Sequence, residues 1–391
     1  MTELSVNGVA RSLLGLLHEL DYSKVDVDLF LFLHKGEWLG QIPKQVQLLP
    51  QNDAYASLCK TFNCLRSERR YGWLVLRTLA LYITACCFKL RRLKVEEHGL
   101  NQITSLICMP FLPELSRDTY DLAISFAGFQ DVTSRKVLAR RKAGWIHTDY
   151  RIHHPLYWLD VRNWSVADYI VNVSRSAKEG FDAIYPQFRS RSISIENVLS
   201  ATWVRRQVND AATELISDPS RVQILTVGRL SQAKGLDRAV AAAALLKKQN
   251  IQFRWYVIGS GELNKRVDEW VHENQLEDCF FLLGEKANPY PYFAACDIYV
   301  QPSNFEGKAV AVREAQMLGK PVVIARYATA ESQVRHGIDG LIAEMSAESV
   351  ADAIQQLIEN PELGKRLSAN CGISDFSNRD EIEKIYGLMA I

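Results

Sequence analysis

The stretch 222–261 decides the fold, with VQILTVGRLSQAKG at 222–235, a helical pattern over 236–249 and FRWYVIGSG at 253–261. Both apolar runs are short, rich in β-branched and aromatic residues and bounded by glycine, which is typical of buried strands. Because a helix connects them, the two strands are expected to run parallel in one sheet. The stretch therefore predicts the first part of a doubly wound α/β domain.

The same alternation continues to residue 325. It consists of a helix over 263–274, FFLLG at 280–284, a short helix at 290–295, DIYVQPS at 297–303, a helix over 310–318 and PVVIA at 321–325. Ligands bind such sheets beyond the carboxyl ends of the strands, so we expect the chemistry just after each strand.

The first half of the chain repeats this pattern less cleanly. Apolar runs that predict strands lie at 25–33, 103–109, 122–126, 143–147, 169–173 and 192–195. Between residues 209 and 219 the sequence turns polar and ends in SDPSR, which predicts a linker. Two doubly wound domains are therefore predicted, one over 1–208 and one beginning at 209, and two facing sheets would form a cleft.

Length and composition limit the class of protein. A chain of 391 residues is expected to hold two or three domains, and 48% hydrophobic with 23% charged residues excludes a disordered or fibrous protein. The 46 Lys and Arg balance 45 Asp and Glu, which argues against nucleic acid as a partner. The eight cysteines lack zinc-site spacing and the N-terminus lacks a signal-peptide pattern, so we expect no metal and a cytoplasmic location.

The run 71–90, YGWLVLRTLALYITACCFKL, approaches the roughly 20 apolar residues that span a bilayer, although Arg77 interrupts it. Three interpretations stay open: a core helix with solvated ends, a helix lying on an anionic membrane surface, and a membrane span. The basic flanks that favour the membrane surface are Arg66, Arg69, Arg70, Lys89, Arg91, Arg92 and Lys94, with Glu68 as the nearby acid.

Gly228, Arg229 and Lys234 lie between the first strand of the second half and the helix that follows. Two cations, backbone N–H groups and a helix N-terminus there suit a phosphate group, and a solvated loop is the alternative. The next strand ends in Gly259 and Gly261, which let the backbone approach a ligand or only make a tight turn. Since the third glycine of the dinucleotide fingerprint is lacking, a nicotinamide cofactor is not expected.

The segment 301–315, QPSNFEGKAVAVREA, is the most specific one. Glu306 lies in a loop after a strand, and Glu314 lies about two turns into the next helix. A carboxylate accepts two hydrogen bonds from a diol, so one could bind a sugar and the other a ribose, whereas a surface Glu and an ordinary helix Glu are the alternative. The amides of 307–309 at the helix entrance suit phosphate oxygens.

GRL-x3-KG, IGSGEL, NPYPYFAACDIYVQPSNFEG and EG-x6-EA-x3-GKPVV resemble the C-terminal domain of retaining family 4 glycosyltransferases of the GT-B fold. The likeness is strong over 222–343 and looser upstream, at GWIHTDY (144–150) and VSRSAKEGF (173–181). The wording of 306–333 looks most like bacterial enzymes that build capsular, exopolysaccharide or lipopolysaccharide chains.

The resemblance implies a role for each candidate site residue of the second half. Arg229 and Lys234 would neutralise the nucleotide diphosphate, Glu314 would bind the ribose, and Glu306 would hold the donor sugar. The other expected substrate-binding residues are Gly228, Gly259, Gly307, Lys308 and Ala309, although many family members have proline where Lys308 stands.

In the first half the resemblance implies that His147, at a strand end, joins Glu306, Arg229 and Lys234 in the catalytic set. Gly8 corresponds to a glycine loop that opens the first helix beside the transferred sugar. Family members have a first strand of about six apolar residues before that loop. We expect this strand to be missing here and to leave a gap in the N-terminal core. By family architecture alone, 379–391 is expected to form a helix that returns to the first domain.

The implied reaction moves a glycosyl unit, with retention and without metal or cofactor, from a nucleotide diphosphate sugar to a hydroxyl of a glycan or lipid-linked glycan. The protein is then expected in the cytoplasm or on the inner face of the plasma membrane. A non-catalytic nucleotide-sugar-binding or truncated scaffold homologue is the alternative. A nucleotide-sugar 2-epimerase is a third interpretation, against which the pair Glu306 and Glu314 argues.

Overall fold

The computed structural model describes residues 1–5, 7–92, 95, 97–116, 118–148, 150–152, 155–208, 218 and 220–389. Contacts along the chain divide it into two compact units, Met1–Val198 with Arg379–Ile391, and Leu199–Asn378. The second unit begins ten residues before the expected start at 209, because α9 (Ala201–Gln207) packs against α12 (Tyr290–Ala295) and α13 (Val310–Met317). Apart from residue 218, the expected linker 209–219 lies outside the described residues.

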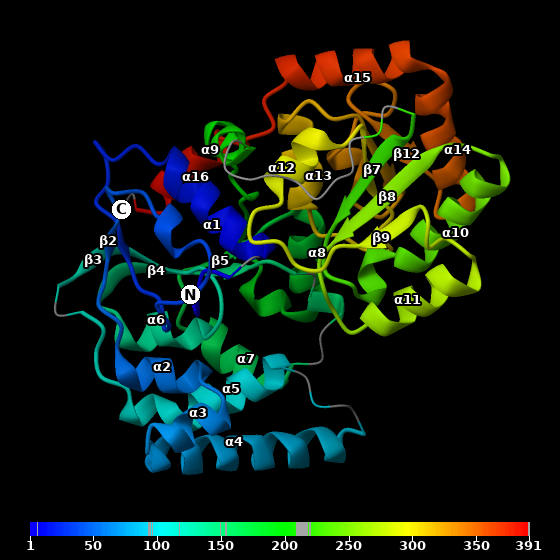
Figure 1. Cartoon of the computed structure of the whole chain (residues 1–391). Helices are drawn as coiled ribbons and strands as arrows, with labels where there is room; N and C mark the ends of the chain where they lie inside the picture. The colour runs from blue at the N-terminus through cyan, green and yellow to red at the C-terminus, as the bar shows by residue number, and fades with distance from the viewer. Residues whose placement is uncertain are drawn as a thin grey trace. The chain divides into compact units, whose positions relative to one another are not determined.

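The second unit is built on a six-stranded, all-parallel sheet in the order β12-β11-β10-β7-β8-β9. The chain runs from β7 to β8 and β9 on one side (Figure 1) and then returns to place β10 on the other side of β7. The direction of winding therefore reverses between β7 and β10. The strands are β7 (Val222–Val227), β8 (Phe253–Ile258), β9 (Phe280–Leu282), β10 (Ile298–Gln301), β11 (Val322–Ala325) and β12 (Leu341–Ala343).

Helices cover both faces of this sheet, as its buried strands require. In Figure 1, α12 and α13 lie on one side of the strands and α10 and α14 on the other. All strands and helices predicted between 222 and 325 are present. The remaining helices are α10 (Leu236–Lys248), α11 (Asn264–Glu273), α14 (Ala347–Glu359) and α15 (Pro361–Ile373).

The first unit contains a four-stranded parallel sheet in the order β3-β4-β5-β6 and a separate pair, β1 and β2. The strands are β1 (Asp28–Leu29), β2 (Gln47–Leu48), β3 (Tyr120–Ser125), β4 (Ala139–Ile146), β5 (Tyr169–Asn172) and β6 (Ser192–Ser194). The helices are α1 (Gly8–Glu19), α2 (Asp53–Cys59), α3 (Phe62–Ser67), α4 (Tyr71–Leu90), α5 (Glu97–Cys108), α6 (Gln130–Lys136), α7 (Tyr157–Trp164), α8 (Arg175–Ile184) and α16 (Glu381–Gly387).

Two of the strands predicted for this unit are corrected. The run 103–109 is not a strand, because all but its last residue belongs to α5. A short apolar run has no periodicity that separates a buried strand from a buried helix. The run 25–33 forms a strand only at Asp28–Leu29. The other four predicted strands of this half are present as β3 to β6.

The start of the chain lies beside the segment that follows β1. The Phe32 N–H donates to the Met1 carbonyl (3.1 Å), and the Leu4 N–H donates to the Lys35 carbonyl (3.0 Å). In the sheets of the described residues, β1 pairs only with β2 and β3 only with β4. Residues on both of these edges, with α1 and α16, line a cavity of about 240 Å³.

The segment 379–389 packs within the first unit. The Arg379 Nε lies 3.2 Å from Glu19 Oε2, and the Tyr386 hydroxyl accepts a hydrogen bond from the Asp21 N–H (2.9 Å). The helix α16 buries Ile382 and Ile385. These contacts explain why the last residues of the chain group with 1–198.

Candidate functional site

The loops after β7 and β10 meet at the point where the winding of the second sheet reverses. The two strands are neighbours in register, with Leu225 opposite Tyr299. Backbone hydrogen bonds then join their loops, since the N–H groups of Asn304 and Phe305 both donate to the Ala233 carbonyl, at 2.8 and 3.2 Å. Doubly wound sheets bind their ligands at this kind of position.

Lys234 and Glu306 form an ion pair there. The Lys234 Nζ lies 2.6 Å from Glu306 Oε1, and only 8% of the Glu306 residue is exposed. The same oxygen accepts from the Ser303 hydroxyl (2.6 Å) and from the Gln301 amide (3.2 Å). Three donors thus hold this carboxylate in one place at the carboxyl end of β10. The sequence placed Lys234 and Glu306 correctly in strand-end loops but did not identify Ser303 and Gln301 as partners.

A left-handed glycine fixes the position of Lys234. Gly235 has φ +61°, and a Cβ built on it would lie 2.1 Å from the Pro302 carbonyl oxygen. Only glycine allows the two loops to approach this closely. The Arg238 guanidinium donates to the same carbonyl (2.5 Å) and to Asn304 Oδ1 (2.8 Å). The stem of Lys234 in turn covers Gly228, with Cε 3.3 Å from a Cβ built there.

Gly259 and Gly261 pack against the backbone of the loop after β7. A Cβ on Gly259, which has φ +142°, would lie 1.9 Å from the Gly228 oxygen, and one on Gly261 would lie 2.3 Å from the Leu230 oxygen. The close packing of these two loops is a sufficient reason for both glycines, and it agrees with the interpretation in which they only make a tight turn. Contact of Gly259 with a ligand stays a prediction.

Arg229 lies on the surface next to this pair of loops. Its side chain is 75% exposed, and its Nε lies 3.6 Å from Glu262 Oε2. An exposed ion pair of this length contributes little to stability, so the guanidinium can turn toward an anion at small cost. The structure places Arg229 and Lys234 on one loop, but only Lys234 is fixed by its surroundings.

Thr329 and Gln333 clamp the segment that begins with Glu306. The Thr329 hydroxyl donates to the Glu306 carbonyl (3.0 Å), and Gln333 both accepts from the Ala309 N–H and donates to the Ala309 carbonyl, each at 3.1 Å. The Ala309 amide therefore has a partner within the unit and would have to leave Gln333 to bind phosphate. No spacing pattern in the sequence identifies Thr329 and Gln333 as partners of this segment. Roles for Gly307 and Lys308 stay predictions.

Glu314 is fully buried in α13. Its Oε1 accepts from the Tyr290 hydroxyl (2.7 Å), and the ring of Trp203 packs edge-on against Tyr290 with centroids 5.5 Å apart. The structure therefore assigns Glu314 a structural partner, and binding of a ribose would need this carboxylate to be uncovered. Tyr290 lies in the YPYF run at 290–293, which is part of the family resemblance, but no spacing in the sequence identifies it as the partner of Glu314.

His147 lies in the first unit, directly after β4. Its Nε2 lies 2.8 Å from the Phe126 carbonyl oxygen, and burial lowers its pKa from 6.5 to about 4. A neutral imidazole beside a carbonyl donates its Nε2–H, so Nδ1 is the acceptor. His153 and His154, which could compete for the same role, lie outside the described residues.

Gly8 is the first residue of α1. The preceding residue, Asn7, caps the helix by accepting from the Ala10 N–H (2.9 Å). Among the described residues, and apart from its chain neighbours and the backbone of α1, no heavy atom lies within 4 Å of a Cβ built on Gly8, so there is space beside the start of this helix. Its contact with a sugar stays a prediction.

Comparison with known proteins agrees with this arrangement. Residues 210–371 match the family "Glycosyl transferases group 1". The amylovoran biosynthesis glycosyltransferase AmsK of Erwinia amylovora is 32% identical over 145 residues, which cover 35% of this chain and 36% of AmsK. The putative colanic acid biosynthesis glycosyltransferase WcaL of Salmonella typhimurium is 30% identical over 139 residues, 33% of this chain and 34% of WcaL. The chain thus spans about a third of the length of these two curated relatives.

Solved structures extend the likeness to the whole chain. Anabaena Alr3699/HepE, crystallised with UDP and glucose, has a TM-score of 0.63 at 16% identity and covers 100% of this chain and 98% of its own. A mutant of S. aureus TarM, crystallised with fondaparinux, α-GlcNAc-glycerol and UDP, has a TM-score of 0.60 at 18% identity and covers 74% and 59%. Residues 210–371 are thus a group 1 glycosyltransferase domain, in a chain that has the fold of the GT-B glycosyltransferases.

Proposed function

We propose that this protein transfers a glycosyl unit from a nucleotide diphosphate sugar to a hydroxyl of a glycan or lipid-linked glycan in the synthesis of a cell-surface polysaccharide. The single observation that carries the proposal is the Lys234–Glu306 pair at the switch point between β7 and β10. A cation and a carboxylate held side by side suit the two halves of such a donor, the diphosphate and the sugar hydroxyls. AmsK and WcaL, named for amylovoran and colanic acid biosynthesis, support the class of product.

The residues of this chain act mainly through electrostatics in the proposed reaction. Breaking the glycosidic bond leaves negative charge on the departing diphosphate. Lys234, Arg229 and the N-terminus of α10 would stabilise that charge. Glu306 would orient the sugar through its hydroxyls, since it lies in a loop and is already fixed by Ser303 and Gln301.

We propose that the base of the donor nucleotide is uracil. Alr3699/HepE has been crystallised with UDP-glucose, and the pneumococcal O-GlcNAc transferase GtfA with UDP and GlcNAc. Retention of the anomeric configuration is part of the proposal, with the leaving phosphate taking the acceptor proton in a front-side attack. Transfer without a metal ion is also part of it, and activity that persists in excess EDTA would support it.

The test measures donor binding and turnover separately. Purified protein is heated with UDP, GDP and ADP and with their sugars, and the same panel is applied to Lys234→Met. At a ligand concentration 100 times the Kd, binding stabilises the native state by about 2.7 kcal/mol. We expect one nucleotide series to raise the Tm of the wild type and not of Lys234→Met. No shift with any of them would refute the donor site.

Turnover decides between the enzyme and the alternative, a non-catalytic nucleotide-sugar-binding homologue. Release of UDP from UDP-sugar in the presence of a cell-surface glycan extract, and the anomeric configuration of the product by NMR, are the readouts. Donor-induced stabilisation without nucleotide release across a broad set of acceptors would favour the non-catalytic interpretation.

The proposal also places the protein in the cytoplasm, at an anionic membrane surface on the inner face of the plasma membrane. A lipid-linked acceptor would reside there. The support is the basic and apolar region 66–92, in which α4 is long and apolar enough to meet the criteria for a membrane helix.

A further inference from the structure

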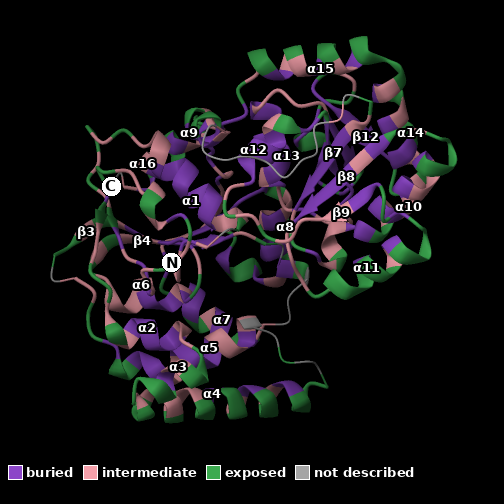
Figure 2. Ribbon diagram, in the orientation of Figure 1, coloured by how far each residue is buried: buried purple, intermediate pink, exposed green. Residues whose placement is uncertain are grey.

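The helix α4 presents an apolar face to solvent. Only Ala80, Thr84 and Phe88 of its twenty residues are buried, and the outer side of the helix is largely exposed in Figure 2. The side chains at intervals of three and four residues along that side are Tyr71, Val75, Leu79, Tyr82, Cys86 and Leu90, with exposures that include 66% for Val75 and 86% for Leu90. A surface helix normally carries polar residues there.

Basic side chains mark both ends of this face. Arg66 and Arg69 precede the helix, Lys89 lies in its last turn and Arg92 follows it, and all four are exposed. No acidic residue occurs between 71 and 90. An apolar stripe with cations at both ends is complementary to the acyl region and the anionic headgroups of a bilayer.

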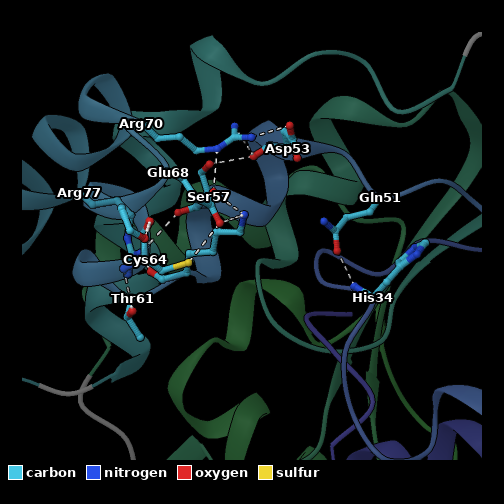
Figure 3. A network of polar contacts seen from close by, with 11 residues as sticks. His34, Gln51, Asp53, Ser57, Thr61, Cys64, Glu68, Arg70 and Arg77 are labelled. Carbon is cyan, nitrogen blue, oxygen red and sulfur yellow. Dashed lines mark hydrogen bonds and ion pairs between the residues drawn. The ribbon is translucent and has the colours of Figure 1, made fainter.

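Two acids near the start of α4 are engaged with other groups. Glu68 binds Lys60 and Arg70, and Asp53 binds Arg70, at 2.5 to 3.0 Å (Figure 3). The Arg77 guanidinium points into this network and donates to the Lys60 carbonyl. Arg77, the cation in the middle of the apolar run, is therefore turned away from the exposed face, and the start of α4 is tied to α2 and α3.

The other end of α4 adjoins two exposed aromatic residues. The Arg91 guanidinium donates to the Pro155 carbonyl (2.9 Å), and Leu156 and Leu159 form one buried cluster with Ala80 and Phe88. Directly after Leu156, the α7 residues Tyr157 and Trp158 are 51% and 56% exposed. Aromatic side chains of this kind are enriched at the headgroup level of membranes.

We infer that α4 lies flat on an anionic bilayer. The stripe Tyr71–Leu90 would lie in the acyl boundary, and Arg66, Arg69, Lys89 and Arg92 would lie at the headgroups. The inference rests on the membrane part of the proposed function and names the surface responsible. The inference favours a helix on the surface over a span, because α4 packs against α2, α3 and α5 of its own unit. The occupant of this face is therefore a lipid surface.

The test is flotation of the full chain with vesicles of phosphatidylglycerol and phosphatidylcholine, compared with phosphatidylcholine alone. We expect Val75→Glu/Tyr82→Glu to reduce the partition coefficient at least tenfold. The matched control is Ile373→Glu, since Ile373 is 87% exposed on the second unit and should bind as the wild type does. Each basic residue near an anionic surface contributes about fivefold, so Lys89→Gln/Arg92→Gln should lose roughly 25-fold on the anionic vesicles only. Lys248→Gln is the control for charge.

The outcomes separate the two proposals. A wild type that floats with neither vesicle refutes the membrane location together with this surface. A wild type that floats while the α4 variants float equally well refutes this surface alone. Circular dichroism shows whether the α4 variants fold. The nucleotide-induced Tm shift should be unchanged in every α4 variant, which would show that membrane binding and donor binding depend on different residues. Equal binding to neutral and anionic vesicles would refute the role of the four cations.

Discussion

The Lys234–Glu306 pair predicts a measurable coupling energy even without ligand. Lys234→Met leaves Glu306, 8% exposed, with only the neutral donors Ser303 and Gln301. Breaking a fully buried pair costs about 3–5 kcal/mol, and the Lys234 side chain is 24% exposed, so we expect about 2 kcal/mol. Glu306→Gln leaves a lysine that can turn to solvent, which should cost about 1 kcal/mol.

The double variant lacks both charges and should cost about 1.5 kcal/mol, which gives a coupling energy of roughly 1.5 kcal/mol. The second unit, Leu199–Asn378, has a size at which 1 kcal/mol corresponds to ~2–4 °C, so Lys234→Met should lower its Tm by about 4–8 °C. Scanning calorimetry on all four proteins resolves the transition of this unit. A coupling energy below about 0.5 kcal/mol would mean that the charges act independently and would refute the reasoning.

Three further predictions concern local geometry. Gly235→Ala places a Cβ 2.1 Å from a backbone oxygen of the neighbouring loop and should destabilise by well over 2 kcal/mol, whereas Gly284→Ala, at φ +69° with open space, should cost about 1–2 kcal/mol. Equal Tm losses would contradict this. Burial lowers the pKa of His147 from 6.5 to about 4, so on acidification the imidazole is protonated in the unfolded chain before it is protonated in the native state. The free energy of unfolding should therefore fall as the pH drops from 6.5 to 4, by about 2 kcal/mol at pH 5. His147→Gln should flatten that part of the urea-unfolding profile, and an unchanged slope would count against burial as the cause. Ala123 lines the cavity of about 240 Å³ in the first unit, so Ala123→Val should stabilise the protein by about 1 kcal/mol. The control is Ala143→Val at a buried position of β4, which should destabilise it by ~1–3 kcal/mol. A loss of stability in both variants would show that the cavity cannot accept the added methyl groups.

The second unit could be read from its sequence because each strand ends in a recognisable turn. The glycines after β7 and β8 and the Asn-Phe-Glu-Gly loop after β10 stop apolar runs too short to be helices. The first unit lacks such punctuation. The run ITSLICM at 103–109 has the apolar content of a strand but continues a helix that begins at residue 97, whose periodicity becomes visible only over the longer window.

Candidate site residues were predictable where chemistry depends on the loop and not where it depends on packing. Lys234 and Glu306 follow neighbouring strands, so topology alone brings them together. The burial of Glu314 under Tyr290 depends on α9, a helix on the far side of the linker in sequence. No spacing within 301–315 contains that information, and binding of a ribose by Glu314 stays a prediction.

The unliganded pair has a consequence for how a donor would be received. A lone buried cation would draw a diphosphate strongly but would destabilise the empty site, because an unpaired buried charge carries a desolvation penalty. Pairing with Glu306 removes that penalty, and in the proposed reaction the pair would open when the diphosphate of the donor binds Lys234. The carboxylate then loses its charged donor and needs new ones, which sugar hydroxyls supply. In the proposed reaction the two ends of the donor therefore bind cooperatively. The diphosphate draws Lys234 away from Glu306, and the freed carboxylate then accepts hydrogen bonds from the sugar hydroxyls.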